Sequence, residues 1–359
     1  MAALILNNTT VLIPANNVTG TLPINLFYAV FLPILSLATI TGNLMIIVAF
    51  WKVPALHHKP SELLVLNLSF VDLLTGFTLI MGSTFMILPD RWLFGEAGCR
   101  VFIALFYTGI HTGILSLITI SVDRLLLVKL DYSRYLKIQS PTRIKITIGV
   151  CWSVSLFSIF LEQATWEVAK KIDKSAASID YAKRCLIPPR RLREYSLFMF
   201  ITYYLIPVFT VCASSLAFLY FLRKRLKKKQ KGPLGQVIVQ ATEPTTSSSQ
   251  PTSGQSSKDT DNLQKQQYSS RKRYIKPAIT FILLVTAMLL CMMPYGLYVI
   301  SIEVFCHECI NTNVVYTLVM VQYFNACLDP IFYGMTNKKI RAYYGWCLPG
   351  RNSIQPLLT

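Results

Sequence analysis

The side chains in this sequence that could do chemistry lie inside or beside long apolar stretches. Asp72 interrupts one apolar run, Asp123 and Arg124 follow one another near the end of the next, and Asp329 precedes Pro330 in the last. A carboxylate in apolar surroundings is costly unless a cation, strong hydrogen-bond donors or a proton compensates it. These residues are therefore candidates for binding or switching.

Among the basic residues, Arg124 is the clearest candidate for a functional role. At a helix end its guanidinium can pair with Asp123 or donate to a backbone carbonyl of a bound partner helix. An arginine that reaches lipid headgroups is the alternative.

The cysteines and polar clusters do not suggest an enzyme. No nucleophile–base set, metal cluster or phosphate loop stands out, so the sequence predicts no catalysis and no required cofactor. Cys306 and Cys309 form a single Cys-X-X-Cys, which lacks the second half of a zinc site. A local disulfide is the favoured interpretation, and a redox or zinc role the weaker one.

The elements that must position these residues are membrane-spanning helices. Charged residues make up 14% of the chain and hydrophobic residues 53%, whereas soluble domains carry about 25% charged residues. Seven segments approach the roughly 20 apolar residues that a spanning helix needs: 26–51, 63–88, 101–122, 146–161, 195–222, 277–302 and 313–335. The predicted fold class is an all-α membrane protein, a seven-transmembrane helix bundle.

The basic residues indicate orientation rather than nucleic-acid binding. The net charge is +18, but the basic residues lie between the apolar runs, which suits a membrane protein and excludes a nucleic-acid partner. The loops after the third and fifth segments are strongly basic and residues 1–25 are uncharged, so the N-terminus is expected outside. The loop after the fourth segment is also basic, although the usual excess of Lys and Arg in cytoplasmic loops does not predict a basic loop on the outer side.

The predicted domain organisation has four parts. Residues 1–25 form an extracellular tail with glycosylation sequons at Asn7, Asn8 and Asn17, and residues 26–335 form the membrane domain. Within it, residues 227–270 are rich in Ser, Thr, Gln and Lys and predict a disordered cytoplasmic loop. Residues 336–347 predict an amphipathic helix on the membrane surface, with Cys347 either palmitoylated or a free thiol. Residues 348–359 form a C-terminal tail.

Motifs in successive segments resemble those of one receptor family. They are Gly42-Asn43, Asn67 to Asp72, Trp92 to Gly95 before Cys99, Asp123-Arg124-Leu125, Trp152, Pro207, Pro294 and Asn325 to Tyr333. In this order they resemble the signatures of rhodopsin-class (class A) G-protein-coupled receptors. The resemblance covers the whole membrane domain and implies a plasma-membrane receptor with heterotrimeric G protein, arrestin, receptor kinases and lipid as partners.

The resemblance also implies roles for particular residues. It implies a disulfide between Cys99 and Cys185 and a sodium ion near Asp72, although a protonated carboxyl bridged by water is an open alternative. The residues expected around that ion are Asp72, Asn43, Ser116, Asn325 and Asp329, and those expected in coupling and activation are Asp123, Arg124, Met292, Pro294, Asp329, Pro330 and Tyr333.

The sequence departs from the family pattern at several switch positions. Leu125 replaces the usual tyrosine, Met292 the usual tryptophan, and Gly113 the usual serine. Ser215 replaces a tyrosine on the fifth segment, and Tyr274 replaces an acid on the sixth. These changes predict a weaker hold on the resting state and leave the fold intact.

The resemblance places a ligand pocket toward the outer face of the bundle. The residues expected to line it are Phe106, Tyr107, Ile110, Phe200, Tyr203, Tyr204, Tyr295, Tyr298, Val319 and Tyr323, although helix packing alone would explain about half of them. Phe106 stands where amine receptors of the family have an aspartate, so a typical biogenic amine is disfavoured. The seventh segment has no lysine for retinal.

One other class of function remains open. A seven-span transporter or channel would show internal repeats and a polar path, and the two halves of this sequence show no repeat.

Overall fold

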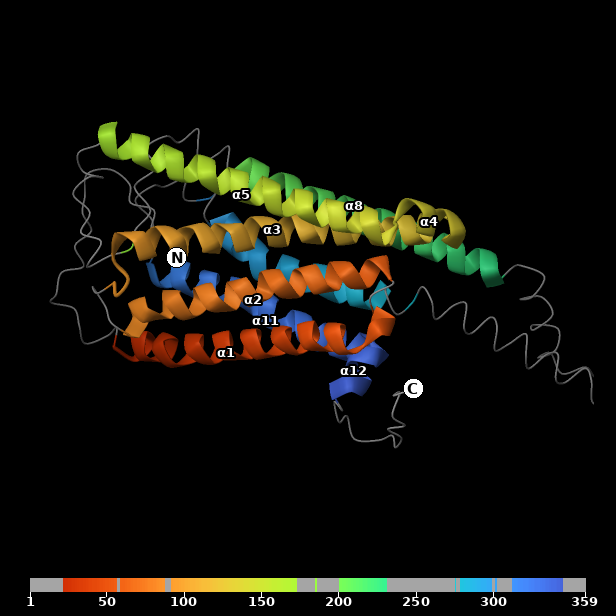
Figure 1. The fold of residues 1–359 in the computed structure, drawn as a ribbon, viewed down its shortest axis with the longest axis horizontal. Coiled ribbons are helices and arrows are strands. Elements are labelled where there is room, and N and C mark those ends of the chain that lie inside the picture. The colour runs from red at the N-terminus through yellow and green to blue at the C-terminus, as the bar shows by residue number, and fades with distance from the viewer. Residues whose placement is uncertain are drawn as a thin grey trace, which may run out of the picture.

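The computed structural model describes residues 22–56, 59–87, 92–172, 185, 200–230, 275, 278–298, 301 and 312–344. Every element in these ranges is helical. The long helices run side by side and form an elongated bundle (Figure 1). Predicted residues outside these ranges are Asn7, Asn8, Asn17, Tyr274, Cys306, Cys309 and Cys347.

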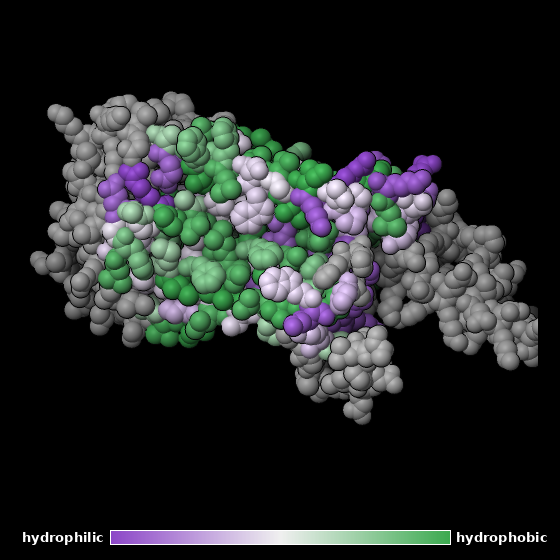
Figure 2. Space-filling model, viewed as in Figure 1, coloured by the Kyte–Doolittle hydropathy of each residue, from purple (hydrophilic) through white to green (hydrophobic). Residues whose placement is uncertain are grey.

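Seven long helices confirm the predicted bundle. They are α1 (Leu22–Lys52), α2 (Pro60–Ile87), α3 (Gly95–Lys129), α5 (Pro141–Ile172), α8 (Ile206–Gln230), the Ala278–Tyr298 helix and α11 (Thr312–Thr336). Six of them are long and apolar enough to cross a membrane, and α11, with 25 residues, has the length that spanning requires. Hydrophobic residues cover the middle of the bundle and hydrophilic ones gather toward its two ends (Figure 2).

Short helices occupy the connections. A 3-10 turn, η1 (Pro54–Leu56), follows α1, α4 (Tyr132–Ile138) follows α3, and a π-helical turn, η2 (Ile201–Leu205), precedes α8. The helix α12 (Lys338–Tyr344) follows α11, within the predicted surface helix. A π turn adds a residue to a helical turn and often occurs at functional sites.

The observed spans are longer than their apolar segments. The fourth segment was predicted as 146–161, but α5 begins at Pro141 and continues to Ile172. Hydropathy marks only the lipid-facing part of a helix, and Arg143 and Lys145 extend this one beyond that part. Proline is favoured in the first turn of a helix because it has no N–H to leave unpaired.

The helix α3 occupies the centre of the bundle. It packs against α2, α5 and α8. Asn67 on α2 joins three helices: its Nδ2 donates to Ser116 Oγ at 2.7 Å, and its Oδ1 accepts from Trp152 Nε1 at 2.9 Å. Such bonds hold helices together inside a membrane, where apolar side chains gain little by leaving lipid.

Candidate functional site

Two buried carboxyl groups lie opposite one another in the middle of the bundle. Asp72 on α2 is 3% exposed and Asp329 on α11 is 1% exposed. The two carboxyls are close enough to hydrogen-bond when one carries a proton. Asn43 on α1 donates from Nδ2 to the carbonyls of Thr39 and Ala326, each at 3.0 Å. Asp72, Asp329, Asn43 and Asn325 are called the carboxyl layer below.

Several oxygen atoms of this layer have no partner within the described part of the chain. They are Asn43 Oδ1, Asp72 Oδ2, Asn325 Oδ1 and both carboxylate oxygens of Asp329. Buried polar atoms are normally hydrogen-bonded, because leaving them unpaired is costly. An all-oxygen set with carboxylates suits a hard cation such as sodium, or ordered water.

Ser116 lies beside the carboxyl layer, and its hydroxyl is already hydrogen-bonded to other groups. Its Oγ donates to the carbonyl of Thr112 at 2.6 Å and accepts from Asn67. Its contribution to the carboxyl layer is therefore to hold α2 against α3.

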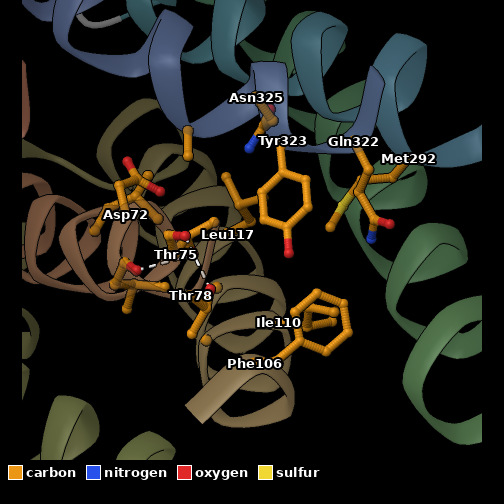
Figure 3. Close-up of a pocket in the computed structure, with 15 residues that line it drawn as sticks. Asp72, Thr75, Thr78, Phe106, Ile110, Leu117, Met292, Gln322, Tyr323 and Asn325 are labelled. Atoms are coloured by element: carbon orange, nitrogen blue, oxygen red, sulfur yellow. Dashed lines mark hydrogen bonds between the residues drawn. The ribbon is translucent and has the colours of Figure 1, made fainter. Parts of the chain in front are cut away.

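A narrow cavity of about 50 Å³ runs from the carboxyl layer toward the predicted ligand pocket. Figure 3 shows the walls: Asp72, Thr75 and Thr78 come from α2, and Gln322, Tyr323 and Asn325 from α11. The remaining lining residues are Leu68, Val71, Phe106, Gly109, Ile110, Gly113, Leu117, Met292 and Ala326. The cavity thus links residues predicted for the ligand with residues predicted for the ion.

The predicted ligand residues fall into two groups. Near the cavity, the Phe106 and Tyr323 rings lie 6.2 Å apart, and Val319 and Tyr295 pack in the same apolar cluster. Ile110 lines the cavity, Tyr107 meets Phe106 edge to face at 5.3 Å, and Tyr298 is half-buried at the end of its helix.

The second group gathers at η2. Phe200 stacks on Tyr204 with ring centroids 5.2 Å apart, and Tyr203 stacks on His111 at 3.8 Å. The Tyr204 hydroxyl donates to the Met292 carbonyl, and a Cβ on Gly296 would overlap the Tyr204 ring. The π turn therefore places Tyr204 directly against the sixth helix, a contact that requires glycine at position 296.

His111 is a buried residue that sequence reasoning missed. Its Nδ1 lies 3.0 Å from Ser158 Oγ, and the Ser158 hydroxyl donates to the Ser155 carbonyl at 2.8 Å. A hydroxyl has one hydrogen, so Nδ1 of His111 must carry the proton and donate. A lone histidine in an apolar run was the available signal.

Asp123 and Arg124 lie near the C-terminal end of α3 in a network of polar contacts. Asp123 is fully buried and accepts from Tyr135 Oη at 2.9 Å and Gln139 Nε2 at 3.3 Å. Arg124 Nη1 lies 3.6 Å from Asp123 Oδ2. Burial and the nearby Asp123 carboxylate raise the pKa of Tyr135, so its phenol remains a donor.

Arg225 is a second residue at this end that the sequence did not single out. Its Nη1 donates to the carbonyls of Val128 at 2.9 Å and Leu130 at 2.6 Å, and its Nη2 lies 3.6 Å from Asp131. The last carbonyls of a helix lack intrahelical partners, and a cation there is stabilising. Arg225 thus fastens α8 to the end of α3.

The other predicted activation residues are spread along the sixth and seventh helices. Tyr333 is 2% exposed and packs in the main core, Met292 lines the cavity, and Pro294 is exposed. Pro330 packs against α1, where a Cβ on Gly42 would lie 3.1 Å from its Cγ. Gly42 therefore lets α1 approach α11 closely.

The N-terminal end of α3 carries the disulfide that the family resemblance implied. Cys99 and Cys185 are joined with their Cα atoms 5.3 Å apart. Trp92 and Phe102 pack beside them, and Trp92 Nε1 donates to the Gly95 carbonyl at 2.8 Å.

Comparisons with known proteins agree with this geometry. Residues 42–333 match the family described as 7 transmembrane receptor (rhodopsin family). The chain is 32% identical to the human muscarinic acetylcholine receptor M1 over 130 residues. These residues are 36% of this chain and 28% of that receptor. It is 27% identical over 214 residues to the dog adenosine receptor A3, which covers 60% of this chain and 67% of that receptor.

Proposed function

Because the chain belongs to the rhodopsin family of seven-transmembrane receptors, we propose that it is a plasma-membrane receptor with its N-terminus outside. An extracellular ligand binds in the bundle, and the cytoplasmic end then activates a heterotrimeric G protein. Arrestin and receptor kinases follow as further partners, with the Ser/Thr-rich segment within 227–270 as the substrate of the kinases.

The observation that carries this proposal is the position of two features on α3. The cavity reaches Phe106, and the Asp123–Arg124 pair lies at the other end of the same helix. Arg124 follows Phe106 by eighteen positions, which at about 1.5 Å per residue is roughly 27 Å. A rigid helix of this length connects a ligand at one face of a membrane to a partner at the other.

The residues near the cavity support a proposal about the ligand class. One relative is named for acetylcholine and another for adenosine, but Phe106 supplies no carboxylate at its level of the cavity. A typical biogenic amine would be left without a counter-ion there. Retinal is excluded from the proposal because no lysine is present on α11.

Nucleotide exchange on purified G proteins tests the proposal. The receptor is reconstituted in lipid nanodiscs with a panel of G proteins, and candidate ligands are screened for accelerated GTP binding. Ligand-dependent exchange on at least one G protein is expected. Ion conductance or solute uptake by the reconstituted chain, without exchange on any G protein, would overturn the proposal in favour of a channel or transporter.

We also propose that Asp72, Asp329, Asn325 and Asn43 hold a sodium ion, because their unpartnered oxygens suit a hard cation. Sodium at ten times its Kd should raise the free energy of unfolding of purified receptor by about 1.4 kcal/mol, which is measured as a higher unfolding temperature. Asp72→Asn should remove this effect, and Asp131→Asn at the 81% exposed Asp131 side chain is the control. Equal stabilisation by potassium would argue against a sodium site.

A further inference from the structure

The cavity between α2, α3, the sixth helix and α11 is long and narrow. Along α3 it extends from Phe106 to Leu117, and along α2 from Thr78 to Leu68. At about 1.5 Å per residue each stretch is roughly 15 Å long, but the space open to the centres of water-sized molecules is only about 50 Å³. An occupant that follows the cavity must therefore be slender.

Gly109 and Gly113 line the cavity on the α3 side, and their missing side chains let α3 approach α2 closely. A Cβ on Gly109 would lie 3.3 Å from Thr75 Oγ1, and a Cβ on Gly113 would lie 3.4 Å from Val71 Cγ1. Met292 lines the same cavity, and a methionine side chain is unbranched and adapts its shape to its neighbours. An unbranched chain can pass these residues where a branched or aromatic group cannot.

The inner end of the cavity suits a cation. Asp72 lines it and is 3% exposed, and its Oδ2 has no hydrogen-bond partner among the described residues. The second buried carboxyl, Asp329, lies next to it. A protonated nitrogen donates charge-assisted hydrogen bonds to such a group. The outer end, with the Phe106 and Tyr323 rings, is aromatic.

We propose that the ligand site continues past Met292, and that its ligand is a primary ammonium on an unbranched alkyl chain. The ammonium nitrogen donates to Asp72 Oδ2, the chain lies along Gly109 and Gly113, and the outer part of the molecule meets Phe106. The inference rests on the proposed receptor function and names the ligand class of the same site. It agrees with the exclusion of typical biogenic amines, because the counter-ion lies deeper than Phe106.

Alkylammonium ions of increasing length provide the probe. The full chain is purified in phosphatidylcholine nanodiscs, in a buffer with a bulky organic cation, and its thermal unfolding is followed from ethylammonium to hexylammonium. Affinity should rise about threefold to fourfold per methylene, since each buried methylene contributes ~0.8 kcal/mol. Sodium should compete with hexylammonium. Hexanol, which has the same shape without the charge, should bind at least about tenfold more weakly.

Two matched variants locate the probe. Met292→Trp narrows the cavity, so it should weaken hexylammonium binding about tenfold or more while sodium still stabilises the protein. Met293→Trp makes the same change on a neighbouring half-buried residue that is not among the lining residues of the cavity, and it should bind hexylammonium as the wild type does. Asp72→Asn should lose both ligands.

Three results would overturn the proposal: no stabilisation by hexylammonium, equal stabilisation by hexanol, or equal binding to Met292→Trp and the wild type. If Asp72→Asn does not fold, the two methionine variants still decide. The measurement uses no G protein. A failure of nucleotide exchange would therefore count against the receptor function, and a failure of the thermal shift against the extended site.

Discussion

The two ends of α3 are held in place by different kinds of bond. At the N-terminal end, which is the outer end in the proposed topology, Cys99 is joined covalently to Cys185. At the C-terminal end, which is cytoplasmic in that topology, Asp123 accepts hydrogen bonds from Tyr135 and Gln139, and Arg225 donates to the final carbonyls of the helix. The outer attachment persists in any conformation, whereas the cytoplasmic contacts can be exchanged for those of a partner.

This difference indicates which end of the helix can switch. Charge-assisted hydrogen bonds contribute about 1.5–3 kcal/mol each, which a bound protein can replace with its own contacts. Between the two ends, the helix lines a cavity and carries Gly109 and Gly113. α3 is therefore held covalently at its outer end and lines a cavity in its middle. At its cytoplasmic end it is held by contacts that can be exchanged.

The largest effect is expected from Arg124→Ala, which should abolish G-protein activation while surface expression stays largely intact. We expect the guanidinium to serve mainly the partner contact, because Asp123 keeps its hydrogen bonds from Tyr135 and Gln139 in this variant. Arg100→Ala is the control on the same helix, because Arg100 is a half-buried residue near the N-terminal end of α3 whose side chain pairs with the exposed Glu96. Ligand-induced nucleotide exchange is measured against surface receptor number. Wild-type signalling from Arg124→Ala would remove this residue from the coupling mechanism.

Breaking the outer attachment should give the next largest effect. Cys99→Ser and Cys185→Ser should each disrupt surface delivery or ligand response, because loss of a native disulfide typically costs about 2–5 kcal/mol. The double variant should be no worse than either single one, since both remove the same bond. Cys212→Ser, at a free and half-buried cysteine, is the control. Additive losses would show that the disulfide does not account for the defect.

A smaller effect is expected from Tyr135→Phe at the cytoplasmic end. The change removes the hydrogen bond that Tyr135 donates to the fully buried Asp123, at a cost of about 1.5–3 kcal/mol in stability. Tyr132→Phe changes a tyrosine of the same helix that is 39% exposed and should be neutral. Thermal unfolding of the purified variants measures both. Equal midpoints would mean that Gln139 and Arg124 hold Asp123 without the phenol.

The smallest expected effect concerns basal activity. Tyr274 replaces the acid that the family resemblance pairs with Arg124, so ligand-independent signalling should be measurable. Tyr274→Glu should reduce it, because a well-formed charge-assisted contact moves a two-state equilibrium by roughly tenfold or more. Ser215 should lower basal activity, because it stands where the family has a tyrosine that stabilises the active state. Its hydroxyl donates to the Val211 carbonyl of its own helix at 2.6 Å and cannot replace the missing phenol.

Basal nucleotide exchange is plotted against surface receptor number for the wild type, Tyr274→Glu and the uncharged control Tyr274→Gln. A flat wild-type line, at the level of cells without the receptor, would show that the missing acid has no consequence at this end of α3.

The predicted spans were correct in number and order because apolar length is a local property of the chain. Their ends were less accurate: α3 runs from Gly95 to Lys129 instead of 101–122, since a helix continues into water where hydropathy gives no signal. The disulfide partners were found through the family motifs. The contacts of His111, Tyr204 and Arg225 were missed, because each depends on a residue of another helix.

The sequence by itself determined that this is a seven-helix membrane protein with buried acids, because a lipid environment permits few alternatives to a helix and makes each charge conspicuous. The tertiary structure decided which polar groups are satisfied. Asp123 accepts from Tyr135 and Gln139 at Oδ1 and has Arg124 3.6 Å from its Oδ2. Asp72 lines a cavity, and its Oδ2 has no hydrogen-bond partner among the described residues. The register between packed helices sets that difference, and no local pattern in the chain encodes it.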